Sequence, residues 1–191
     1  MFKNRIHILA MALILTALGI GPCYALDSLI ANINQAAAIV NPADPTDVRA
    51  LLRFDLPTEL DTTKFVTYAE LRFGVNTTGQ FEHPIRLRIN PLTSAWTPGN
   101  IGWSAPWSRS GGDFADTIGS IGHIDTVGQF VVKIDIANII QDYIRGYYPN
   151  HGIIIRQHGS LRRAFNLVQN RYPGGAVAQL AIYYIDLDPD D

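Results

Sequence analysis

The sequence contains almost no cysteine and few charged side chains. Of its 191 residues only Cys23 is a cysteine, and charged residues make up 17% of the chain. Cys23 falls inside the signal peptide predicted below, so the mature chain would hold no disulfide and no thiolate for nucleophilic attack or metal binding. A disulfide framework and thiol chemistry are therefore excluded, and the core must supply the stability of the mature chain.

The sequence motifs of several enzyme classes are also missing. There is no G-x-S-x-G elbow, no phosphate-binding glycine loop that ends in Lys-Ser/Thr, and no H-E-x-x-H pair. None of the histidines after the signal has the spacing of a zinc ligand: His83, His123, His151 and His158. These absences predict a protein that is not an enzyme and requires no cofactor. A lyase or hydrolase that uses tyrosine and histidine is the alternative.

The N-terminal segment has the pattern of a secretory signal peptide. Basic residues precede the apolar run 8–20, and Cys23 and Ala25 place small side chains at the positions that determine cleavage. The run is shorter than the ~20 residues of a spanning helix. We therefore expect a signal peptide at 1–25 and a secreted, cell-surface or periplasmic product. Lipid anchoring at Cys23 is disfavoured by Pro22, which stands where such signals have glycine or alanine.

The remainder of the chain is slightly acidic and of single-domain length. Without Lys3 and Arg5 the 15 basic residues become 13, against 17 acidic ones, a net charge of −4. This balance argues against general nucleic-acid binding, and no second apolar stretch is long enough to span a membrane. We expect one domain at 26–186, followed by an acidic tail at 187–191.

Alternation of apolar and polar residues is the main structural signal. It predicts strands at 50–56, 66–75, 85–89, 130–136, 152–157, 164–169 and 178–185, with a weaker candidate at 26–34. The connections are rich in Asn, Pro, Gly and Asp, as turns are. Short strands separated by such turns predict an all-β antiparallel β-sandwich, jelly-roll-like.

One helix and one long loop interrupt the strands. Helical spacing at 136–148 places Ile139, Ile140, Tyr143, Ile144 and Tyr147 on one face. Asp135 or Asn138 would cap this helix and Gly146 would end it, and we expect it to cover one end of the sandwich. Five glycines and little periodicity between residues 108 and 128 predict a surface loop.

The order of short blocks along the chain carries a family resemblance. The blocks are RALLRFDLP, VTYAELRFGV, a W-T-x(5)-W tract ending in Pro-Trp, VKIDIANIIQDYIRG, NHGIIIRQ and AQLAIYYID. Together they resemble the DNRLRE domain, an extracellular jelly-roll domain of bacterial and archaeal surface proteins, over roughly 26–186. The resemblance implies this fold and no general catalytic function. It also implies a likeness to an alginate-binding carbohydrate-binding module and to proteins of extracellular matrix and cell aggregation.

Within that resemblance the tryptophan tract is only partly matched. Trp96, Thr97, Trp103 and Pro106 match the family block, Asp135 matches its helix-opening acid, and Asn150-His151-Gly152 matches its turn, whereas Pro98 and Gly102 depart from it. We therefore expect Trp96 and Trp103 in the core, because such indoles lock a long connection against a sheet. Trp107 is expected to face water and to contact a ligand.

Arginines on polar strand faces suggest a binding surface for an acidic polymer. Arg86 and Arg88 share one strand face, and Tyr68 lies on the same side of its strand as Arg72. Arginine pairs with carboxylates, and aromatic rings cover the apolar side of a pyranose. If their strands are neighbours, the arginines form a basic stripe with Arg53, Arg156 and Arg162. The alternative is ordinary exposed ion pairs with acids on neighbouring strands.

Loop carboxylates raise the possibility of structural calcium. Asp113, Asp116 and Asp125 lie in the glycine-rich segment, and carboxylates with backbone carbonyls are the ligands of this hard cation. The alternative is the turn chemistry that Asp beside Gly commonly serves.

Two functions fit these observations. The first is a secreted, non-catalytic module that binds an extracellular or cell-surface polysaccharide. The alternative is a structural subunit of a surface layer, matrix or filament, because binding modules usually accompany a catalytic domain. The apolar segment 26–40 would then pair with the sheet edge of a neighbouring subunit, unless it forms a strand of its own sheet.

Overall fold

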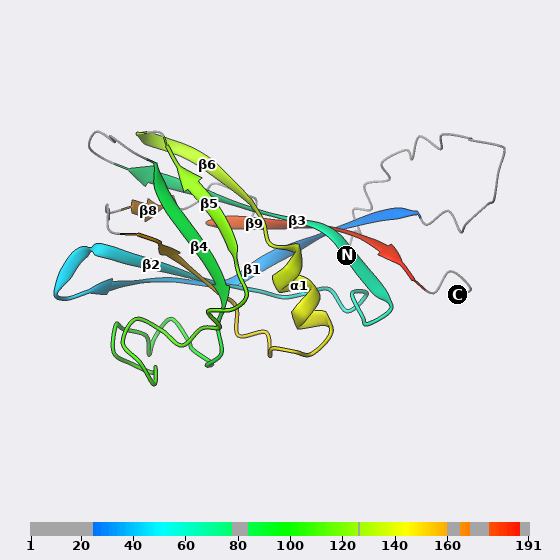
Figure 1. Cartoon of the computed structure of the whole chain (residues 1–191), viewed down its shortest axis with the longest axis horizontal. Helices are drawn as coiled ribbons and strands as arrows, with labels where there is room; N and C mark the ends of the chain where they lie inside the picture. The colour runs from blue at the N-terminus through cyan, green and yellow to red at the C-terminus, as the bar shows by residue number, and fades with distance from the viewer. Residues whose placement is uncertain (1–24, 78–83, 126, 160–164, 169–175, 188–191) are drawn as a thin grey trace.

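The computed structural model describes residues 25–77, 84–125, 127–159, 165–168 and 176–187. These residues form an all-β antiparallel sandwich, jelly-roll-like, with one short helix (Figure 1). The strands are β1 (Leu26–Asn41), β2 (Asp44–Phe54), β3 (Lys64–Thr77), β4 (Ile85–Pro91), β5 (Ser120–Ile124), β6 (Gly128–Asp135), β7 (Ile153–Gln157), β8 (Phe165–Leu167) and β9 (Ala178–Asp186). The fold class predicted from alternation is confirmed.

One long strand, β1, joins the two layers. Its residues 26–32 pair with β9, its residues 33–41 pair with β2, and the register shifts between Ile33 and Gln35. One layer, the β3 sheet, is β1–β9–β3–β6, with β8 pairing with the end of β3. The other, the β4 sheet, is β1–β2–β7–β4–β5. Faces of the two sheets that point away from the core therefore lie on opposite sides of the sandwich.

The core fills the space between the sheets with the apolar residues of each alternating pattern. Leu71 and Phe73 of β3 and Leu52 and Leu87 of the β4 sheet have no exposed surface. Leu71, Leu52 and Leu87 are each followed by an arginine that points outward, as the period of two requires. At the side where β5 meets β6, Gly122 has no side chain because a Cβ would lie 2.2 Å from Ile134 Cδ1.

Helix α1 (Ala137–Ile144) closes the core after β6. Asp135 Oδ1 accepts the backbone N–H groups of Ala137 and Ala69, which joins the start of the helix to β3. Gln141 Oε1 accepts the N–H of Val66, and Tyr143 donates to the carbonyl of Gly152 at 2.6 Å. The apolar face of the helix is buried as predicted, but Tyr147 lies beyond the helix and is exposed.

The weak strand candidate at 26–34 is confirmed but is shorter than the observed strand, and the loop predicted at 108–128 is wrong in part. The weak candidate at 26–34 is the start of a strand of 16 residues, whose second half is alanine-rich and held by β2. The predicted loop at 108–128 contains β5, which pairs with β4. Alanine and glycine weaken the local β signal, so these strands form because neighbouring strands supply partners for their backbone groups.

The described residues include only one residue of each predicted terminal segment. The predicted signal peptide lies outside them except for Ala25, and the acidic tail lies outside them except for Leu187. In the ranges that the structure covers, no helix is both long and apolar enough to cross a bilayer.

Candidate functional site

The structure separates the predicted ligand residues onto two faces. Tyr68 and Arg72 lie on the outer face of the β3 sheet, because they alternate with core residues of β3. Arg86 and Arg88 lie on the outer face of the β4 sheet for the same reason. The expected stripe is therefore divided: Arg72 lies in the other layer, whereas Arg53, Arg156, Arg86 and Arg88 come from the neighbouring strands β2, β7 and β4. Arg162, also expected in it, lies outside the described residues.

The outer face of the β3 sheet carries an aromatic and apolar surface. We call it the aromatic face, formed by Leu26, Ile30, Phe65, Tyr68, Tyr183 and Ile185. Tyr183 of β9 pairs directly with Tyr68 of β3, and their ring centroids are 5.9 Å apart with the planes tilted by 37°. Tyr68 is 38% exposed and Phe65 is 41% exposed. Two strands thus present neighbouring aromatic rings to solvent.

A polar network adjoins the aromatic face. Glu70 accepts a hydrogen bond from Tyr68 Oη at 3.2 Å and one from Arg72 Nε, and Lys133 Nζ lies 3.7 Å from Glu70 Oε1. Burial raises the pKa of Glu70, but the Arg72 guanidinium and the other donors hold it below its usual value. Burial and the hydrogen bond to Glu70 raise the pKa of Tyr68, so its hydroxyl keeps its proton and donates. Aromatic rings and polar groups thus stand side by side.

A second apolar cluster lies on the outer face of the β4 sheet. Its buried members are Ile39, Leu51, Leu92, Trp96, Trp107 and Ile154. The Nε1–H of Trp96 donates to the carbonyl of His151 and that of Trp107 to the carbonyl of Gly102, each at 2.8 Å. The connection between β4 and β5 thereby covers part of this sheet, which explains the apolar residues on both faces of β2 and β7.

The expected division of the tryptophans is partly wrong. Trp96 is buried as predicted, but Trp107 is only 7% exposed, because Leu51 and Ile154 offer it an apolar surface. Trp103 is half-buried. The Arg49 guanidinium stacks over its ring, and Arg49 Cζ lies 4.5 Å from the centroid of that ring. The tract thus serves mainly to fasten the loop, and Trp107 is not available to a ligand in solution.

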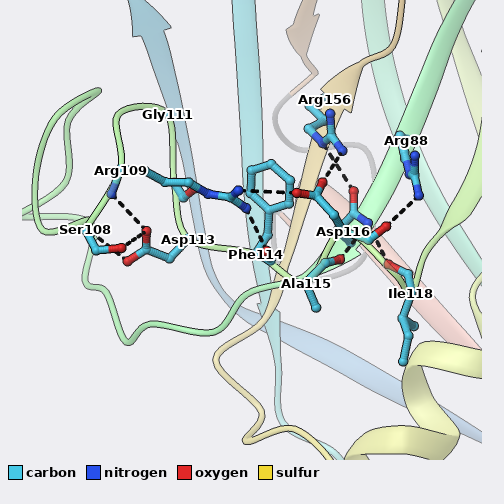
Figure 2. Close-up of polar contacts among 12 residues, drawn as sticks. Arg88, Ser108, Arg109, Gly111, Asp113, Phe114, Ala115, Asp116, Ile118 and Arg156 are labelled. Carbon is cyan, nitrogen blue, oxygen red and sulfur yellow. Dashed lines mark hydrogen bonds and ion pairs between the residues drawn. The ribbon is translucent and has the colours of Figure 1, made fainter.

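Asp113 organises this loop, as Figure 2 shows. Its carboxylate accepts hydrogen bonds from the Ser108 backbone N–H, Ser108 Oγ and Ser94 Oγ, each at 2.8 Å, and from the Arg109 N–H at 3.1 Å. Burial raises the pKa of Asp113, but these donors outweigh that effect and hold it below its ordinary value. The carboxylate therefore holds the loop together through these hydrogen bonds.

The three predicted calcium ligands do not form a metal site. Asp116 pairs with Arg109 and Arg156, and Asp125 lies just beyond the end of β5. Across the described ranges, no group of three or more His, Cys, Asp or Glu side chains is placed to hold a metal ion. The convergence expected of Asp113, Asp116 and Asp125 is therefore wrong, because loop hydrogen bonds and arginines occupy the first two carboxylates.

Arginines gather around Asp116 instead (Figure 2). Arg156 Nη2 lies 2.9 Å from Oδ1 and Arg109 Nη1 lies 3.2 Å from Oδ2, while Arg88 Nη2 donates to the backbone oxygen of Asp116 at 2.6 Å. The Phe114 ring lies between two of these guanidinium groups, 4.1 Å from that of Arg109 and 4.4 Å from that of Arg156. Burial lowers the pKa of Arg156, and the charges of neighbouring arginines lower it further against the effect of Asp116.

Sequence reasoning missed several members of these surfaces. Tyr183 alternates with core residues in β9, so its outward direction was readable, but its pairing with Tyr68 was not. Phe114 and Arg109 lie in a segment without periodicity, and no local signal marks their stacking.

Comparison with known proteins adds no relative. No protein-family model matches the chain, and a search of curated proteins finds no match. The resemblance to the DNRLRE domain therefore stays a prediction.

Proposed function

We propose that this chain is a secreted, non-catalytic β-sandwich module that binds an extracellular or cell-surface polysaccharide through the aromatic face. The observation that carries the proposal is the pair of the exposed Tyr68 and the half-buried Tyr183, with Glu70 bonded to Tyr68 and Arg72 beside it. Aromatic rings cover the apolar side of a sugar ring, and carboxylate and guanidinium groups bond its hydroxyls. The pattern of a signal peptide at 1–25 and the resemblance to an extracellular domain support the same role.

The geometry of the face suits a polymer. The residues lie along β3 and β9 on the surface of a sheet, so successive sugars have a continuous surface to follow. A fixed polar network limits the side-chain entropy lost on binding, because Glu70 already holds Tyr68 and Arg72.

Affinity electrophoresis of residues 26–191 tests this proposal. Gels that contain alginate, pectin or a neutral glucan should retard the protein in at least one case, and Tyr68→Ala should abolish most of that retardation. Tyr147→Ala is the matched control, because Tyr147 is 67% exposed and lies outside the aromatic face. Unchanged mobility in every gel, or equal retardation of the two variants, would contradict the proposal.

A specific observation supports the second function, a structural subunit of a surface layer, matrix or filament. Leu26 is 61%, Ile30 47% and Phe65 41% exposed on this same face, and apolar patches of this kind mark association surfaces. Light scattering after size exclusion distinguishes the two functions. A monomer that a glycan retards supports the module, whereas polymers that grow with concentration, without glycan affinity and lost in Ile30→Glu, support the subunit.

A further inference from the structure

A row of basic side chains crosses the outer face of the β4 sheet, on the opposite side of the sandwich from the aromatic face. We call it the cationic strip, formed by Arg86 and Arg88 of β4, Arg156 of β7, and the flanking His123 and His158.

Strand register brings these residues together. Arg88 pairs directly with Arg156 across β4 and β7, and Arg86 pairs directly with His123 across β4 and β5. On the other side of β4, the backbone N–H of His158 donates to the carbonyl of Arg86 at 2.8 Å, so His158 follows Gln157 opposite Arg86. Side chains of directly paired residues lie on the same face of a sheet, within about 5.5 Å at Cβ. The strip is therefore one surface, not a set of separate charges.

The strip carries more positive charge than its neighbours neutralise. Asp116 is the carboxylate that pairs with Arg156, and it is shared with Arg109. Arg88 reaches only a backbone oxygen, and within the described residues the Arg86 side chain makes no hydrogen bond or ion pair. Like charges directly opposite each other destabilise a sheet, and the one carboxylate of Asp116, shared with Arg109, offsets this repulsion only in part. A bound anion would relieve the remainder.

The guanidinium groups are also held in position before any ligand arrives. Arg156 is fixed by Asn90 Oδ1 at 3.2 Å, by Asp116 and by the Phe114 ring. Arg88 is fixed by the Asp116 carbonyl. Ordered guanidinium groups present parallel N–H donors to an oxyanion at a lower entropic cost than mobile ones.

We propose that the cationic strip is a second binding site, which takes the oxyanion groups of an anionic polymer, either carboxylates or sulfate esters. Arg86 supplies the exposed charge, Arg88 adds a second guanidinium, and His123 and His158 add N–H donors on either side. This site does not depend on the proposed function of the aromatic face, because no residue is shared and the two faces point in opposite directions.

Retention on immobilised polyanions tests the proposal with the mature chain. At low salt the wild type should be retained by at least one of two columns, heparin, which carries sulfate esters, and polygalacturonate, which carries only carboxylates, and neutral dextran should not retain it. Arg86→Gln should elute at lower salt, and Arg86→Gln with Arg88→Gln should bind about tenfold or more weakly, as expected for lost charge-assisted hydrogen bonds. Retention on the heparin column alone would identify sulfate esters as the bound group, and retention on the polygalacturonate column alone would identify carboxylates.

The matched control is Arg145→Gln, which removes an exposed arginine that is not part of the strip and lies just after α1. It should elute like the wild type, and thermal unfolding followed by circular dichroism should show both single variants folded. Tyr68→Ala should keep full retention on the polyanions, which separates this site from the aromatic face. Failure of the wild type to bind either column, or equal elution of Arg86→Gln and Arg145→Gln, would overturn the proposal.

Discussion

Arg88 and Arg156 face each other as a direct cross-strand pair on β4 and β7, and Asp116 compensates for this pairing of like charges. One carboxylate oxygen of Asp116 lies 2.9 Å from Arg156, and its backbone oxygen accepts from Arg88 at 2.6 Å. The loop between β4 and β5 thus contributes the negative charge that the sheet itself does not supply.

Asp116→Asn should destabilise the protein through this pair. The variant leaves Arg156 and Arg109 without the carboxylate, and we expect a loss of about 0.5–1 kcal/mol in the free energy of unfolding, since Asp116 is largely exposed and solvent screens its charge. Urea denaturation at low and high salt measures it. The loss should shrink at high salt, and Glu59→Gln, an exposed acid on another loop, should show no such dependence. A salt-independent loss would contradict this explanation.

Asp113→Asn should destabilise the loop in a pH-dependent way. Four hydrogen bonds lower the pKa of Asp113 in the folded state despite its burial. The unfolded chain therefore takes up the proton first as the pH falls, so the stabilisation is complete above the ordinary Asp pKa of about 3.9 and is lost through the lower folded value.

The measurement is the difference in unfolding free energy between wild type and Asp113→Asn from pH 7 to pH 2. We expect about 1–3 kcal/mol at neutral pH, the usual loss when hydrogen bonds to a buried charged group are removed. The difference should stay constant down to about pH 5 and shrink below about pH 4. A difference that grows as the pH falls would show that the donors do not favour the ionised carboxylate.

The tryptophans should divide differently from the sequence-based expectation. Trp96→Ala and Trp107→Ala should each cost about 3–5 kcal/mol, because both indoles are buried and bonded to backbone oxygens. Trp103→Ala should cost less, because this ring is half-buried and stacks on Arg49. Chemical denaturation of the three variants measures the losses. A small loss at Trp107 with a large one at Trp103 would reverse the order found in the structure.

Gly152→Ala should be strongly destabilising. Gly152 has φ of +89°, and a Cβ there would lie 2.3 Å from the Leu52 carbonyl oxygen, a backbone atom that cannot move aside cheaply. We expect a loss of about 1–3 kcal/mol or more, measured by thermal or urea unfolding. Gly99→Ala is the control, because no heavy atom lies within 4 Å of the Cβ position there. Equal stability of the two variants would contradict the argument.

Local sequence was sufficient to predict the strands that bury one face and the direction of their side chains. In β3 and β4 the alternation of apolar and polar residues sorted core side chains from outward ones correctly, including Tyr68 and Arg86. It was insufficient for β5 and for the second half of β1, where glycine and alanine leave little contrast between the faces. Those strands depend on partners that are distant in sequence.

By itself, the sequence determined the all-β class, the position of the helix and the direction of each strongly patterned side chain, because these follow from local periodicity and turn chemistry. Only the tertiary structure decided which of those side chains meet. Strand order placed Tyr68 beside Tyr183 and Arg88 beside Arg156, and it put Arg72 and Arg86 on opposite sides of the molecule. The burial of Trp107 was decided in the same way, since its apolar surroundings come from β2 and β7. Pairing between strands far apart in the chain has no local signature, which is the physical reason for that division.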